Sequence, residues 1–251
     1  MRTLYWETFQ SQVMWLALVL LAWPAQAGAD GFNDWTGGVV KPGEFLTVPA
    51  LSFRSAKLDD GTRSFESFPQ AQFQVGLFDR VDLILAGATR FNGQGATNDW
   101  IYIQPRVELS QGLSFSPGLN LQADKDGDPF AFAPGIFHTF EPDNWQITWN
   151  LLAYLTPSDW SASSFFFVSV FERKLNKKWS LYAELDVFHY FDKSIGQMNL
   201  TLFVGAMWSF DENDSFNVCL YTPLRPEFEA ASTAIGLWWS HGFDIQPVRH
   251  L

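Results

Sequence analysis

The sequence predicts an all-β protein, an antiparallel transmembrane β-barrel of about 12 strands. Three observations lead to this prediction. Apolar and polar residues alternate along one segment after another, the connections alternate between short and long, and aromatic residues gather at segment ends. The composition agrees, because 47% of the 251 residues are hydrophobic while the mean hydropathy is only −0.04. Apolar residues must therefore be interspersed with polar ones, as in strands whose two faces meet different surroundings.

Composition and charge exclude other classes of protein. Aromatic residues make up 17% of the chain, which is too many for a disordered or collagen-like protein. A formal net charge of −11 argues against a nucleic-acid partner, and we expect none. The single cysteine, Cys219, cannot form a disulfide within the chain, and we expect it to fill space on a strand.

The N-terminus is predicted to be a signal peptide for export. An apolar core at 13–23 follows Arg2 and precedes Ala25-Gln26-Ala27, a small-x-small cleavage site. This core is too short to span a bilayer, which requires about 20 apolar residues. The predicted divisions are a signal peptide (1–27), a periplasmic lead-in or a plug inside the barrel (28–43), an outer-membrane barrel (44–243) and a C-terminal tail (244–251).

The strands are recognised by their period of two. Residues 70–77 place Phe73 and Val75 on one face and glutamines on the other, and residues 81–92 repeat the pattern after a tight turn at 78–80. The twelve expected strands lie near 44–54, 70–77, 81–92, 101–109, 113–122, 130–139, 145–151, 163–172, 179–190, 198–208, 215–222 and 232–243. The number is even, as in single-chain bacterial outer-membrane barrels.

The connections between these strands sort by length. Short ones are expected at 78–80, 110–112, 141–144, 173–178 and 209–214. Longer ones are expected near 55–67, 92–99, 123–129, 156–162, 191–197 and 222–231. Short periplasmic turns and longer external loops are typical of outer-membrane barrels, which places both termini in the periplasm.

Aromatic residues mark the strand ends beside the short turns. The outward positions there are Phe140, Trp145, Phe171, Trp179, Trp208 and Phe243. Such rings form the girdle at a membrane–water interface. The alternative is a soluble β-sandwich, whose core aromatics should gather in the middle of the strands.

One hairpin carries a family resemblance. The run Gly76-Leu77-Phe78-Asp79-Arg80-Val81-Asp82-Leu83, with Lys41-Pro42-Gly43-Glu44 before the first strand, resembles small outer-membrane β-barrel transporters of the MetA-pathway phenol-degradation type. The resemblance implies an outer-membrane channel for small solutes, including apolar or aromatic ones. It implies no catalytic residues.

The polar faces of the strands would line the lumen. Neutral amides and tyrosines dominate this predicted surface, which suits water and polar solutes. The candidate lumen-lining residues are Gln72, Gln74, Gln104, Arg106, Glu108, Asn120, Gln146, Asn150, Tyr182, Glu184, Asp186 and Asn199. The alternative is a closely packed interior that only holds the barrel together.

Charges are few on these inward positions. Asp82 lies on the strand next to Arg106 and Glu108, which predicts a structural ion pair. Pairing Trp179 with Trp208 makes Glu184 face Phe203 and makes Asp186 face Thr201. We expect these two acids to give a pore a weak preference for cations.

An outer-membrane lipid hydrolase is the alternative function. If Arg173 pairs with Trp179 across the turn, Ser163 lies opposite His189 on the lipid-facing side, as a nucleophile and a base would. A third alternative is a structural or adhesion barrel with a closed lumen.

We expect no cofactor and no metal site. Residues 124–128 resemble the opening of a calcium loop, but the twelfth position is Gly135 instead of a bidentate Glu, so an external loop tip is expected. His138 and His241 are expected to face outward near the periplasmic rim. The expected partners are outer-membrane lipid, the barrel-assembly machinery and a small-molecule solute.

Overall fold

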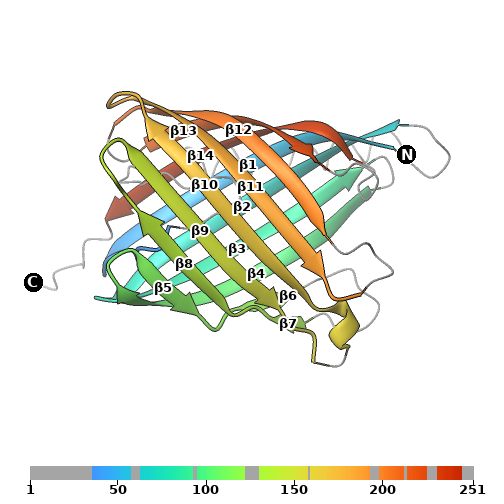
Figure 1. Cartoon of the computed structure of the whole chain (residues 1–251), viewed down its shortest axis with the longest axis horizontal. Helices are drawn as coiled ribbons and strands as arrows, with labels where there is room; N and C mark the ends of the chain where they lie inside the picture. The colour runs from blue at the N-terminus through green and yellow to red at the C-terminus, as the bar shows by residue number, and fades with distance from the viewer. Residues whose placement is uncertain are drawn as a thin grey trace, which may run out of the picture.

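The computed structural model describes residues 36–57, 63–92, 95–121, 130–157, 159–192, 198–211, 214–224 and 231–244. These residues form a closed antiparallel β-barrel of tilted strands (Figure 1). Within them, the only helix is the short 3-10 turn η1 (Trp160–Ala162), and no helix is long and apolar enough to cross a membrane. The predicted signal peptide lies outside the described residues.

Most strands pair with their neighbours in the sequence. The strands are β1 (Glu44–Lys57), β2 (Arg63–Phe78), β3 (Val81–Asn92), β4 (Gly95–Ser110), β5 (Leu113–Ser116), β6 (Leu119–Leu121), β7 (Phe130–Phe132), β8 (Gly135–Phe140), β9 (Trp145–Tyr154), β10 (Ser164–Lys174), β11 (Trp179–Tyr190), β12 (Asn199–Ser209), β13 (Asp214–Pro223) and β14 (Ala231–Asp244). Pairing of β1 with β14 closes the sheet.

The fourteen segments make twelve strands across the wall. Both β5 and β6 pair with β4, so together they form one strand of the wall that is interrupted once. In the next strand of the wall, β8 pairs with β5 and β7 pairs with β6, so this strand is also interrupted once. The breaks fall at Pro117 and Pro134, since proline has no N–H to donate to a ladder. The Ala133 N–H donates to the Gly118 carbonyl at 2.8 Å between the breaks. The prediction of an antiparallel barrel of about twelve strands is confirmed.

Alternating burial separates an outer face from an inner one. On β3, Leu85 is 41% exposed, whereas its neighbours Ile84 and Ala86 are 0% and 6% exposed. The same alternation runs along β11, where Leu181 is exposed and Tyr182 is buried. The outer face is thus an apolar belt, and the inner face holds the polar residues of the barrel wall.

Exposed aromatic side chains surround the end of the barrel that carries the short turns. Phe140, Trp145, Phe171, Trp179 and Trp208 are all exposed, and the rings of Trp179 and Trp208 stack with their centroids 5.9 Å apart. The predicted girdle is confirmed for these five residues, and the side chain of Phe243 lies outside the described set.

Two of the predicted long connections are wrong. Strands β3 and β4 pair as far as Asn92 with Gly95, so the expected loop at 92–99 shrinks to 93–94. Likewise β1 and β2 extend so far that only 58–62 connect them. In both hairpins the backbone pairing continues beyond the residues whose apolar–polar alternation marks the strand, so alternation alone underestimates the length of the strands.

If the apolar belt contacts hydrocarbon, a charged side chain placed on the belt at mid-strand should lower the stability of the barrel. Leu85→Arg should destabilise the barrel in lipid vesicles by about 2–4 kcal/mol, whereas Leu175→Arg, in the short turn after β10, should cost about 0–1 kcal/mol. Urea unfolding of both variants in vesicles measures the difference. Equal costs at the two positions would contradict a membrane-embedded belt.

Candidate functional site: the barrel interior

All twelve predicted lumen residues share the inward side of the burial alternation. Eight of them are buried, namely Gln74, Gln104, Arg106, Asn120, Asn150, Tyr182, Glu184 and Asp186. The other four, Gln72, Glu108, Gln146 and Asn199, are half-buried. The predicted register of β11 on β12 is confirmed, because Glu184 pairs with Phe203 and Asp186 with Thr201.

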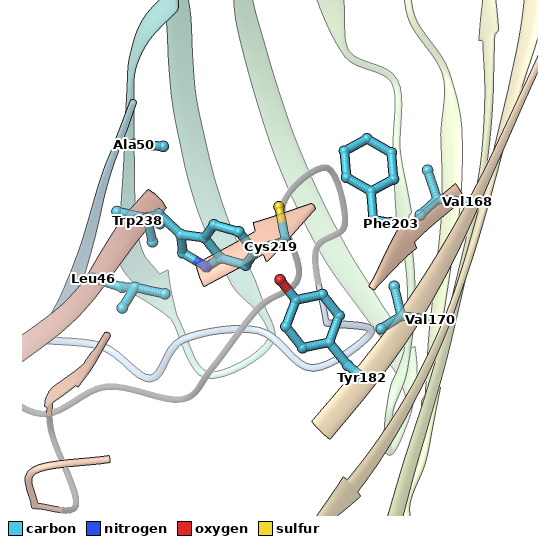
Figure 2. Packing of buried hydrophobic residues seen from close by; sticks show 9 residues of the cluster. Leu46, Ala50, Val168, Val170, Tyr182, Phe203, Cys219 and Trp238 are labelled. Atoms are coloured by element: carbon cyan, nitrogen blue, oxygen red, sulfur yellow. The ribbon is translucent and has the colours of Figure 1, made fainter. Parts of the chain in front are cut away.

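The inner face is less polar than the sequence suggested. One buried group, called here the Trp238 cluster, contains Leu46, Val48, Ala50, Val168, Val170, Tyr182, Phe203, Cys219 and Trp238. Figure 2 shows its side chains projecting into the barrel from strands on opposite sides. A second group, the Tyr154 cluster, contains Ile84, Ala86, Ala133, Phe137, Leu152 and Tyr154, with Tyr102, Phe166 and Phe188 packed against it.

Aromatic rings dominate the contacts within both clusters. In the Tyr154 cluster the ring of Tyr154 stacks on Phe188 at 5.8 Å, and its hydroxyl lies 2.8 Å from that of Tyr102. In the Trp238 cluster the rings of Tyr182 and Trp238 meet edge to face at 5.7 Å. The sequence predicted Tyr182 as lumen-lining, but it did not reveal Tyr102, Phe188 or Trp238, because an inward aromatic residue looks the same in the sequence as one that interrupts the alternation.

Asp82 and Arg106 form the predicted ion pair. Nη2 of Arg106 lies 2.7 Å from Oδ2 of Asp82, and both side chains are fully buried. Nε2 of Gln74 also donates to Oδ2 of Asp82, at 2.7 Å. The guanidinium of Arg106 lies 5.6 Å from the ring centroid of Phe137. Glu108 is not part of this pair; it lies opposite Ser114.

The pair holds the segment before β1 inside the barrel. Arg106 donates from Nη1 to the Thr36 carbonyl and from Nη2 to the Gly38 carbonyl, the latter at 2.9 Å. The Val40 N–H donates to Oδ2 of Asp82 at 3.0 Å, and the Gly37 N–H donates to Oγ1 of Thr139 at 2.8 Å. Residues 36–40 therefore lie against the inner wall near the short turns, from β3 to β8.

Close backbone packing explains the glycine at position 37. A Cβ on Gly37 would lie 1.9 Å from the Gly112 carbonyl oxygen and 2.6 Å from the Thr139 nitrogen. A Cβ on Gly38 would meet nothing within 4 Å. Of these two glycines, Gly37 is thus the one that the segment needs in order to lie on the wall.

The predicted pairing of Ser163 with His189 is wrong by two residues. His189 pairs with Phe165, because the turn closes between Lys174 and Trp179, with Ser180 opposite Lys174. Ser163 is fully buried before β10, and its Oγ accepts from the Thr156 N–H at 3.1 Å. The geometry that motivated the hydrolase alternative is therefore not present.

The described histidines lie apart from one another. Nδ1 of His241 lies 2.6 Å from Oδ1 of Asp214, and the ring of His138 stacks on Trp149. No group of three or more His, Cys, Asp or Glu within the described ranges is arranged to hold a metal ion. The calcium-like run at 124–128 falls outside those ranges.

The fold resembles that of outer-membrane channels. The COG4313 outer membrane channel from Pseudomonas putida F1 aligns with 86% of this chain and 100% of its own, at 12% identity and a TM-score of 0.57. The NanC porin aligns with 78% of this chain and 98% of its own, at 7% identity and a TM-score of 0.57. The KdgM porin in complex with disordered oligogalacturonate aligns with 77% and 99%, at 10% identity and a TM-score of 0.50.

These likenesses establish the fold class, a closed barrel of the outer-membrane type. The chain matches no family model and no curated protein. The resemblance to the MetA-pathway type therefore stays a prediction.

Gly37 allows a direct test of the internal segment. Gly37→Ala should displace residues 36–40 from the wall and lower barrel stability by about 1–3 kcal/mol, because the added Cβ overlaps backbone atoms. Single-channel conductance should rise as the segment leaves the interior.

Gly38→Ala is the matched control, and it should leave stability and conductance unchanged. Identical behaviour of the two variants would show that the segment does not restrict the lumen.

Proposed function

We propose that this protein is an outer-membrane channel for the passive passage of small solutes, including solutes with an apolar or aromatic body. The observation that carries the proposal is the inner face, which combines aromatic rings with hydrogen-bonding side chains inside a closed barrel. The apolar outer belt with its girdle supports placement in a membrane, and the predicted signal peptide and the fold support the outer membrane.

The dimensions restrict what could pass. Twelve strands spaced about 4.8 Å apart and tilted about 40° give a wall roughly 23 Å across between backbones. Inward side chains and residues 36–40, which are held on the inner wall, narrow this width. A folded protein could not pass, whereas a molecule the size of a single aromatic ring could move along the half-buried side chains.

The proposed route runs along the half-buried inward side chains. They include Gln72 on β2, Phe188 on β11, Thr201 on β12 and Tyr221 on β13. Rings at Phe188 and Tyr221 can contact an apolar body, while the amide and hydroxyl groups bond to its polar substituents. This mixture suits an amphipathic small molecule better than a sugar, which offers hydroxyls in every direction.

A structural barrel with a closed lumen is the competing function. Fully buried inward residues such as Arg106, Phe137 and Glu184 favour it, because they leave no accessible surface at their level. Reconstitution in planar bilayers separates the two functions. A channel gives stepwise current and lets liposomes swell in small solutes, while a closed barrel does neither.

A substitution on the proposed route should narrow it. Thr201→Trp adds a ring to a half-buried inward position on β12 and should lower single-channel conductance. Leu202→Trp is the matched control, since the next residue along the strand faces outward.

Conductance traces of both variants at equal insertion provide the measurement. The proposal is overturned if Thr201→Trp conducts like the wild type, or if the wild-type protein gives no current and no swelling.

A further inference from the structure

Two inward arginines lie close together on one side of the barrel interior. Arg54 is near the end of β1 and Arg90 is near the end of β3, both at the end of the barrel opposite the short turn between β2 and β3. Glu66, which pairs with Arg54, and Phe68 lie between them on β2. All four side chains are on the inward side of the burial alternation, and they are called here the Phe68 group.

Arg54 is held in one orientation by two contacts. Its Nε donates to Oε2 of Glu66 at 2.8 Å, and its guanidinium carbon lies 4.5 Å from the ring centroid of Phe68. Glu66 and Phe68 are themselves buried. A side chain that is already fixed loses little rotamer freedom when it binds a ligand. Arg54 is therefore a preorganised binding group.

The far edge of the Arg54 guanidinium remains available. Among the described residues, Nε is the one nitrogen of this guanidinium that has a hydrogen-bond partner. The Arg54 side chain is 26% exposed, and its Nη1 and Nη2 atoms are not buried, in contrast to Nε of Arg90. Nη1 and Nη2 present their N–H bonds in a planar fork, which matches the two oxygens of a carboxylate.

Arg90 adds a second positive charge beside the same ring. Its guanidinium carbon lies 5.4 Å from the Phe68 ring centroid, so the two guanidinium groups lie within about 10 Å of each other. This distance is about one Debye length at 0.1 M salt, so both charges act on one anion, whatever else Arg90 bonds to. Glu66 offsets one of the two charges, and the Phe68 group keeps a net positive charge.

The acids of the facing wall are less accessible than Arg54. Glu184 and Asp186, from which the sequence predicts a preference for cations, lie on β11 and are 0% and 6% exposed. A solute in the lumen therefore meets the fork of Arg54 more readily than it meets these carboxylates.

Small side chains border the two arginines on the inner face. Ala234 pairs with Arg54 on β14, Ala88 precedes Arg90 on the inner face of β3, and Ser52 precedes Arg54 on that of β1. The two alanines are apolar, and Ser52 offers a single hydroxyl. Such surroundings suit an apolar body better than a solute with many hydroxyl groups.

We infer that the Phe68 group binds the carboxylate of a small organic acid with an apolar body, through Nη1 and Nη2 of Arg54. An uncharged solute would give this fork only neutral acceptors, which make weaker hydrogen bonds, and an ammonium ion would be repelled by both arginines. The inference rests on the proposed function, because the solute reaches Arg54 through the lumen, and it narrows the class of solute to carboxylates.

The test compares three solutes of similar shape and different charge. Calorimetric titration of the full mature protein in uncharged detergent micelles uses 3-phenylpropionate, 3-phenylpropanol and 3-phenylpropylammonium. The carboxylate should bind at least about tenfold more tightly than the alcohol, and the ammonium most weakly. If the alcohol or the ammonium binds as tightly as the carboxylate, the inference is wrong.

A charge-neutral variant locates the site. Arg54→Gln/Glu66→Gln removes the fork and leaves the net charge unchanged, so it should weaken carboxylate binding by about tenfold and leave alcohol binding within about twofold. Arg80→Gln removes a positive charge from the exposed turn after β2 and is the control, which should bind like the wild type. Wild-type affinity in the double variant overturns the assignment.

Folding of each variant is read from heat-modifiable gel mobility. If the double variant does not fold, Arg54→Lys replaces it, since lysine keeps the charge beside Glu66 and removes the planar fork. This variant should also bind the carboxylate more weakly than the wild type, and unchanged binding would overturn the assignment.

The result is separable from the channel test. Binding in micelles requires no passage, so carboxylate binding without current in bilayers would refute the channel and keep the site. Current without a preference for the carboxylate in the titration would keep the channel and refute the site.

Discussion

Closure of the sheet through the pairing of β1 with β14 is the constraint on which the rest of the structure depends. No water is present in hydrocarbon to bond a free N–H or carbonyl group, so a membrane-spanning sheet must have no edge. Closure also fixes what each residue can do, because alternate residues face either the outer belt or the interior. The neighbouring exposures of Leu85 and Ile84 follow from this single fact.

Departures from ideal pairing are repaired locally. At the breaks near Pro117 and Pro134, four backbone hydrogen bonds restore the connections that the prolines remove. Ala133 donates to the Gly118 carbonyl, Ala153 donates to the Pro134 carbonyl at 2.9 Å, and Phe132 and Leu155 bond to each other in both directions. The wall thus changes direction without exposing backbone groups, and the inward residues Ala133 and Phe137 on either side of the break stay fully buried.

The sequence was sufficient for the features that depend on alternation, and insufficient for those that depend on contacts across the barrel. The strands, the outer belt and the β11–β12 register follow from local pattern and from one pair of rim tryptophans. The predicted β10–β11 register was wrong by two residues. The number of residues in a turn is set by its hydrogen bonds, such as those from the N–H groups of Lys178 and Trp179 to Asn176, and the sequence does not show them. The position of residues 36–40 depends on Arg106, which no local pattern reveals.

The interior uses a buried charge pair to position a segment of backbone. Arg106 and Asp82 bond to each other and to the backbone of residues 36–40, so their charges are satisfied within the chain and act as an anchor. Replacing a satisfied buried pair by apolar residues is often neutral for stability. The Arg106–Asp82 pair is therefore better explained by the segment that it holds than by the stability that it adds.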